Sequence, residues 1–161
     1  MHELTAWLVS AMVTWVPPGS ADTVRYEAIA EDIANVAAEA PVFPSTDGTA
    51  RTALLMAAIA SYESTFRADI DGFNVKGDHG RSKGLMQVWL RPGEACDDRL
   101  ACLRVGRERI RESLTACAAL PFNERLGVYT MGKCGANPAS RYRIGRAMAF
   151  WKKSPFVTAV N

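Results

Sequence analysis

The sequence predicts a mostly α fold in a single domain. Its 161 residues are the length of one ordinary domain, and 48% of them are hydrophobic, which is enough to bury a core. Apolar residues recur at spacings of three and four along several long segments, as they do on one face of a helix. Prolines and glycines separate these segments, so we expect short connections between the helices.

Two helices are expected within residues 1–48. The apolar stretch 6–16 is followed by Pro17 and Pro18, and we interpret it as a short packed helix. A degenerate signal sequence or a weak anchor is the alternative, although no basic segment precedes the stretch. Asp22 is a suitable N-cap for a second helix, which Pro41 ends. Its apolar positions are Val24, Ile29, Ile33 and Val36.

A third helix is expected from residue 50 to about residue 66, followed by an insert. The apolar stripe of this helix contains Leu55, Ile59, Tyr62 and Phe66. Residues 67–83 lose the helical period and contain three glycines, which predicts irregular chain or a small β-hairpin. Residues 82–90 are then expected to form a short helix or an extended turn.

Two more helices complete the predicted domain. The first covers about 98–118, with Leu103, Ile110, Leu114 and Cys117 inward and Arg104, Arg107, Arg109 and Arg111 outward. The last covers about 139–152 and buries Ile144, Met148 and Trp151. We therefore describe residues 1–161 as one domain, with N-terminal helices in 1–48 and a core in 49–153. No run of 18 apolar residues is present, so stable membrane insertion is not expected.

Four clustered cysteines, Cys96, Cys102, Cys117 and Cys134, predict two disulfides and an oxidising destination. If residues 102–117 form one helix, its end residues lie ~22 Å apart, which is too far for a bond between them. Of the two remaining connectivities we favour Cys96–Cys102 with Cys117–Cys134. Four buried free thiols are the alternative. A zinc site is less favoured, because no C-x-x-C pair exists and both histidines lie outside the cluster.

The charge is small in total but unevenly distributed. The net charge is +2, yet residues 1–48 contain seven acids and one base. The segment 141–153 contains five bases and no acid. Such a face suits a polyanion such as a cell wall, a membrane or a nucleic acid, or it is simply a solvated face. No nucleic-acid-binding motif accompanies it, so no nucleic-acid partner is expected.

Glu63 is the candidate site residue that the pattern itself selects. It lies four residues after Ile59 and three before Phe66, so it borders the apolar stripe of the third helix. A carboxylate buried without a partner is costly, and the expected outcome is an acid that keeps its proton near neutral pH. A general acid needs this property. The alternative is structural, with Glu63 paired to an arginine.

Three short motifs add a family resemblance over roughly residues 50–150. They are Glu63-Ser64, then Gly84-Leu85-Met86-Gln87, then Val128-Tyr129-Thr130-Met131-Gly132. In this order they resemble the lytic transglycosylases of the goose-type lysozyme-like family, in which a catalytic glutamate and serine precede "GLMQ" and "AYNAG". Thr130 and Met131 depart from the asparagine and alanine of that last motif. The resemblance implies a lysozyme-like helical domain with the insert placed after the catalytic helix.

The resemblance also implies a reaction and a set of site residues. The family cleaves the β-1,4 bond between N-acetylmuramic acid and N-acetylglucosamine in peptidoglycan and leaves 1,6-anhydro ends. Glu63 would be the general acid and base, and no metal or cofactor is called for. Residues expected to bind the glycan strand or support the cleft are Ser64, Gly84, Met86, Gln87, Trp89 and Tyr129.

Other functions stay open at this point. Asp69, Asp71 or Asp78 in the insert would supply a second carboxylate for a hydrolytic muramidase. A non-catalytic virion or wall-binding protein on the same scaffold is another alternative, since fold does not fix function. A small wall-cleaving protein would act in the periplasm or cell wall, as a phage virion component, a released endolysin or an exported bacterial enzyme. We expect a monomer. A component of a virion is the alternative partner.

Overall fold

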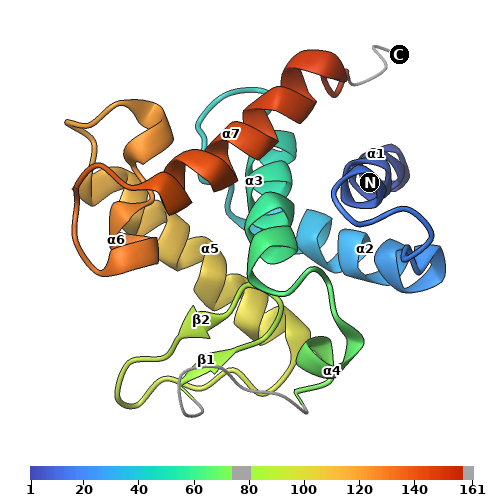
Figure 1. Cartoon of the computed structure of the whole chain (residues 1–161), viewed down its shortest axis with the longest axis horizontal. Coiled ribbons are helices and arrows are strands. Elements are labelled where there is room, and N and C mark those ends of the chain that lie inside the picture. Colours follow the sequence, from blue (N-terminus) through green and yellow to red (C-terminus); the bar gives the residue numbers. More distant parts are fainter. Residues whose placement is uncertain (74–80, 158–161) are drawn as a thin grey trace.

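The computed structural model describes residues 1–73 and 81–157, and these are mostly helical (Figure 1). The helices are α1 (His2–Thr14), α2 (Thr23–Glu39), α3 (Gly48–Glu63), α4 (Ala68–Asp71), α5 (Arg99–Ala116), α6 (Gly127–Met131) and α7 (Pro138–Lys153), with a 3₁₀ turn, η2, at Phe122–Glu124. The strands β1 (Ser82–Lys83) and β2 (Val88–Trp89) form one antiparallel hairpin. The mostly α prediction is therefore confirmed.

Helix α3 is the centre of the molecule. It packs against α1, α2, α5 and α7, which surround it in Figure 1. Every residue from Ala53 to Ser61 is buried, and many of them are alanines, which let neighbouring helices approach closely. The predicted single stripe was too narrow, because this helix is covered on all sides.

The end of α3 differs from the prediction in two ways. The helix ends at Glu63 rather than near residue 66, and Tyr62 is 46% exposed rather than part of the core. Phe66 is buried as expected, but it reaches the core from a turn in which Thr65 and Phe66 have φ of 50° and 53°. Residues other than glycine seldom adopt a positive φ, so tertiary packing holds this turn in place. As a result, Glu63 is the last helical residue.

The N-terminal helices cover one side of α3. Helix α1 buries Leu8 and Met12, so residues 6–16 do contribute a packed helix. The carboxylate of Asp22 accepts a hydrogen bond from the backbone nitrogen of Arg25 at 3.1 Å, which confirms the predicted cap of α2. Val24 is 79% exposed, so its predicted inward position was wrong, and Tyr26 is buried instead. Within the described residues, no helix combines the length and the hydropathy needed to cross a bilayer.

The hairpin begins at residues 82–83, the end of the predicted insert, and within that insert Ala68–Asp71 form the short helix α4. Ser82 pairs with Trp89 and Lys83 with Val88, so the segment 82–89 reverses direction through a turn, in agreement with the extended turn and not with the short helix. Gly84 at the turn has a φ of +67°, and a Cβ there would lie 2.9 Å from the Cβ of Cys102. A glycine is therefore needed both for the turn and for close packing on the disulfide.

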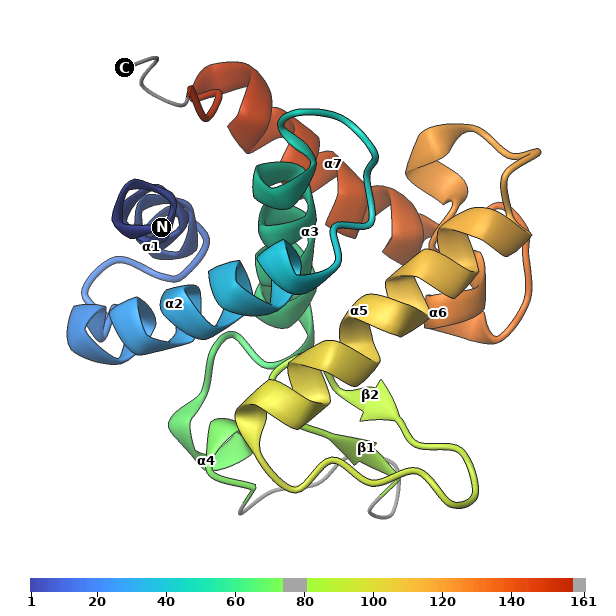
Figure 2. The same cartoon turned by 180° about the vertical axis from the view of Figure 1, so that it is seen from behind.

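Helix α5 runs from the hairpin to α6 and is turned toward the viewer in Figure 2. Arg107 was expected to face outward but is 8% exposed, and its guanidinium donates to the carbonyl of Val36 at 2.7 Å. The prediction for Met148 on α7 was also wrong, because this residue is 54% exposed. Both favoured disulfides are confirmed: Cys96–Cys102 fixes the start of α5, and Cys117–Cys134 ties its end to the chain after α6.

Two glycines test this packing. A Cβ on Gly48 would lie 2.0 Å from the backbone oxygen of Phe43, so we expect Gly48→Ala to lower the free energy of unfolding by about 2 kcal/mol or more. Gly145 lies within α7 with nothing within 4 Å of an added Cβ, so Gly145→Ala should raise that free energy by about 0.5–1 kcal/mol. Urea unfolding of both variants measures the difference, and an unchanged midpoint for Gly48→Ala would contradict the close contact.

Candidate functional site

A cleft of ≈ 740 Å³ opens beside the end of α3. The hairpin and the C-terminal end of α6 form two of its walls, and α5 and α7 each contribute one arginine. The residues that line it are Glu63, Ser82, Gln87, Val88, Trp89, Arg91, Arg109, Val128, Tyr129, Thr130, Met131, Gly132 and Arg143. Of the predicted site residues, the structure therefore brings Glu63, Gln87, Trp89 and Tyr129 together.

Glu63 lines this cleft and is paired with Arg143. The carboxylate oxygen Oε1 accepts from Nε of Arg143 at 3.0 Å and also from Nη2. The Glu63 side chain is 20% exposed and that of Arg143 is 6% exposed. The alternative with an arginine partner is thus the one observed, yet the carboxylate still borders open space in the cleft.

Arg143 is held in place from several directions. Its Nη1 donates to the carbonyl of Ala139 at 2.8 Å, and its guanidinium carbon lies 3.8 Å from the ring centroid of Tyr62. The helix C-terminus carries partial negative charge, which by itself disfavours a carboxylate at Glu63. Arg143 supplies the opposite charge and so stabilises this placement.

Tyr129 lies next to Glu63 but does not donate to it. The phenol donates to the carbonyl of Met86 at 2.6 Å and not to the Glu63 carboxylate. Burial and the negative charge of Glu63 raise the pKa of the Tyr129 phenol above its ordinary value. The tyrosine therefore stays neutral and ties α6 to the hairpin turn.

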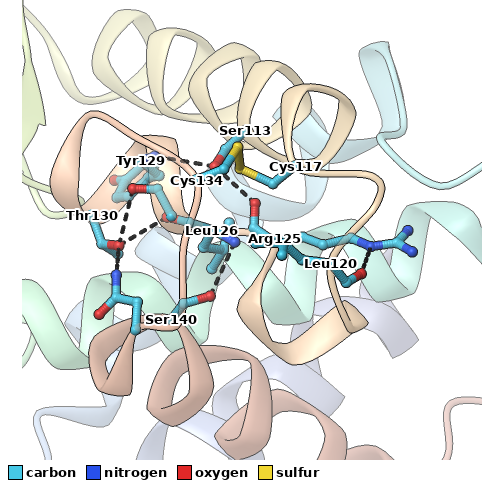
Figure 3. Close-up of a disulfide and its surroundings, with 11 residues drawn as sticks. Ser113, Cys117, Leu120, Arg125, Leu126, Tyr129, Thr130, Cys134 and Ser140 are labelled. Carbon is cyan, nitrogen blue, oxygen red and sulfur yellow. Dashed lines mark hydrogen bonds between the residues drawn. A yellow bond between two sulfur atoms is a disulfide. The ribbon is translucent and has the colours of Figure 1, made fainter.

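The turn that carries Tyr129 is fixed by hydroxyls from two helices (Figure 3). Ser113 on α5 accepts from the backbone nitrogen of Tyr129 at 3.1 Å, and Ser140 on α7 accepts from that of Leu126 at 3.0 Å. Thr130, where the family resemblance expects asparagine, donates to the carbonyl of Leu126 at 2.9 Å. The Cys117–Cys134 disulfide closes the same turn from the outside.

Three predicted site residues lie outside the cleft lining and make structural contacts. Ser64 is buried, and its hydroxyl donates to the carbonyl of Ala60 at 2.9 Å, which helps to end α3. Met86 is buried against Gly106, where an added Cβ would lie 2.8 Å from its sulfur. Gly84 packs on Cys102 as described above. None of the three lines the cleft.

Gln87 and Trp89 remain as cleft residues with different freedom. The amide of Gln87 donates to the carbonyl of Gly84 at 2.9 Å, which leaves its oxygen as the group available to a ligand. Trp89 is 51% exposed, so one part of its indole is open to contact.

Two of the three candidate second carboxylates, Asp69 and Asp71, do not line the cleft. Asp69 lies in helix α4 and pairs with Arg67, which precedes that helix. Asp71 is 6% exposed in its side chain and receives two hydrogen bonds from Arg99, at 2.7 and 2.8 Å. Asp78 lies outside the described residues. Among the lining residues in the described part of the chain, Glu63 is the one acid.

Sequence reasoning missed the three arginines of the cleft. Arg91 and Arg109 pair with Glu94 and Glu112, and the hydrogen bond from Arg109 holds the pKa of Glu94 below its ordinary value. Arg143 had been noted only as part of a basic segment. Arg143 lies three residues after Ser140 and four before Ala147, which are both buried, so it shares their face of the helix, and this was the signal available in the sequence.

No family model, no curated protein and no solved structure matched the chain in comparisons with known proteins. Among the described residues, no group of three or more histidine, cysteine, aspartate or glutamate side chains is placed to hold a metal ion.

The Glu63–Arg143 pair should appear as coupling in a double-mutant cycle. We expect Arg143→Gln to lower the free energy of unfolding by about 2 kcal/mol, somewhat less than for a fully buried pair, because Glu63 keeps some contact with water. Glu63→Gln in the Arg143→Gln background should cost much less than in the wild type. Urea unfolding measures all four proteins, with Arg141→Gln as a control on the exposed side of α7. Simple additivity would contradict the pairing.

Tyr129 should make the protein less stable at high pH. The folded state keeps the phenol proton above the ordinary pKa of about 10, whereas the unfolded chain loses it, so the free energy of unfolding falls as the pH rises past that value. We expect Tyr129→Phe to reduce this dependence, although it also removes a hydrogen bond worth about 1 kcal/mol. Urea unfolding between about pH 8 and pH 11 measures both slopes. Parallel curves would argue against a buried phenol.

Proposed function

We propose that the chain is a peptidoglycan lytic transglycosylase with Glu63 as its general acid and base. The observation that carries the proposal is that Glu63, at the end of the central helix, is the one acid among the described residues that line a cleft of ≈ 740 Å³. Most glycosidases need two carboxylates at the scissile bond. A lone acid suits the transglycosylase reaction, because the substrate provides the attacking group itself.

In this reaction Glu63 first protonates the glycosidic oxygen, and the bond from that oxygen to C1 of the muramic residue breaks. The carboxylate then takes the proton of the C6 hydroxyl of the same sugar, whose oxygen bonds to C1. A 1,6-anhydro end forms, no water is consumed and Glu63 regains its proton. The substrate's own N-acetyl group can assist at C1.

Arg143 contributes to both halves of the proposed cycle. A guanidinium beside Glu63 stabilises the carboxylate that remains once the first proton has left. The same contact orients the carboxylate for the second transfer, since Arg143 is itself fixed by Ala139 and Tyr62. Arg143 is thus a positioning residue in the proposal.

The cleft walls suit a glycan strand. The exposed indole of Trp89 offers an apolar face to a sugar ring, and the oxygen of Gln87 can accept from a hydroxyl or an N-acetyl group. Arg91 is also half-exposed at the cleft, although it forms an ion pair with Glu112. The two disulfides fit the oxidising surroundings of a periplasm or cell wall, where this substrate is found.

Loss of turbidity in purified cell walls tests the enzyme directly. We expect Glu63→Gln to abolish clearing, because the amide cannot donate an acidic proton, whereas Asp69→Asn should clear at the wild-type rate. Mass spectrometry of the released muropeptides should show ends ~18 Da lighter than hydrolysed ones, as loss of water requires. Full clearing by Glu63→Gln would overturn the proposal, and hydrolysed ends together with loss of clearing in an insert-aspartate variant would favour a muramidase.

A non-catalytic wall-binding or virion protein is the second candidate. The observation in its favour is that the polar groups of the cleft already satisfy one another: Glu63 is paired with Arg143, and Tyr129 donates to Met86. In that case the wild type and Glu63→Gln would both sediment with cell walls and neither would clear them. Clearing by the wild type alone would exclude this candidate.

A further inference from the structure

A second groove lies on the other side of α7, against the end of α1. Its volume is ≈ 550 Å³, and its lining residues are Trp15, Arg141, Tyr142, Gly145, Arg146, Ala149, Phe150 and Lys153. Three of these residues are cations, three are aromatic and none is acidic. We call this surface the α7 groove.

The cations of the α7 groove are poorly neutralised. Arg146 donates to the hydroxyls of Ser61 and Tyr142, neither of which carries a charge. Arg141 has Glu124 at 3.8 Å, at the outer limit of an ion pair, and its side chain is half exposed. Lys153 has no carboxylate within ion-pair distance among residues 1–73 and 81–157. The groove therefore presents positive charge that a ligand could neutralise.

A row of stacked side chains connects this groove to the cleft. Arg143 lies over Tyr62, whose ring is 5.2 Å from that of Tyr142. Arg146 follows, 4.8 Å from the Tyr142 ring and 5.8 Å from that of Trp15. Tyr62 and Tyr142 are 46% and 50% exposed, so the two rings in the middle of the row are open to solvent. A polymer that occupies the cleft at Glu63 could thus continue over these rings into the α7 groove.

We propose that the α7 groove binds an anionic glycan, a polysaccharide with carboxylate or phosphate groups, as an extension of the cleft. Arginine and lysine pair with the acidic groups, and exposed aromatic rings offer flat apolar faces to the sugars. Continuity with the cleft favours a glycan over a lipid surface or a nucleic acid. The proposal rests on the proposed function, because it takes the occupant of the cleft to be a glycan strand.

Binding without turnover tests this site separately from catalysis. The protein used is the full chain with Glu63→Gln, and the probes are polygalacturonate, neutral dextran, a DNA duplex and phosphatidylglycerol vesicles. We expect polygalacturonate to bind most tightly, dextran to bind weakly, and the affinity for polygalacturonate to fall as salt is raised. The double variant Arg141→Gln/Lys153→Gln should lose roughly tenfold in that affinity.

Lys152→Gln is the matched control, because Lys152 is an exposed cation on the same helix outside the groove lining. It removes one charge without touching the groove and should leave the affinity nearly unchanged. The proposal would be overturned if Lys152→Gln lost as much affinity for polygalacturonate as the double variant. It would also be overturned if dextran bound as tightly as polygalacturonate, or if the duplex or the vesicles bound more tightly. Wall clearing by the wild type reports the proposed function independently of all these outcomes.

Discussion

The ion pair between Glu63 and Arg143 is the contact on which the cleft depends. Helix α3 is buried all around, so its last residue can carry a charge only where another element brings the opposite charge to it. Arg143 does so from α7, nearly buried itself and supported by Ala139 and Tyr62. One contact therefore joins the central helix to the last helix and fixes a carboxylate on the cleft wall.

The same contact bears on the chemistry of the site. The guanidinium of Arg143 holds Oε1 of Glu63, which fixes the orientation of the carboxyl group on the cleft wall. In the proposed transglycosylase cycle this one group acts twice, because the proton lost to the leaving oxygen is replaced from the C6 hydroxyl of the same sugar. The surrounding polar groups add little freedom: Tyr129 and the nitrogen of Gln87 are bound to backbone carbonyls. In the proposed function, contacts to the glycan would then come mainly from Trp89, the amide oxygen of Gln87 and Arg91.

The sequence predicted the helices and the disulfides better than it predicted which side chains face the core. The cap at Asp22 and both disulfides followed from local rules of spacing and chain length. The predictions that Arg107 faces outward and that Val24 and Met148 face inward were wrong. A helical period shows which residues share a face, but it does not show which neighbouring elements cover that face. Glu63 was found from its position beside apolar residues, but its partner was not, since Arg143 lies 80 positions away. Gly84 and Met86 were predicted to lie in the cleft, but Gly84 packs against Cys102 and Met86 packs against Gly106.

Because of the Cys117–Cys134 disulfide, the covalent closure of one wall of the cleft depends on whether the surroundings are oxidising or reducing. It closes the turn that holds Tyr129, and Tyr129 in turn holds the hairpin through Met86. Newly synthesised chain in a reducing cytosol lacks this covalent closure, since thiols there stay reduced. The turn would then rest on noncovalent contacts, among them the hydrogen bonds to the Ser113 and Ser140 hydroxyls and that from Tyr129 to Met86. Oxidation of the two thiols therefore adds a covalent tie to a segment that hydrogen bonds already position.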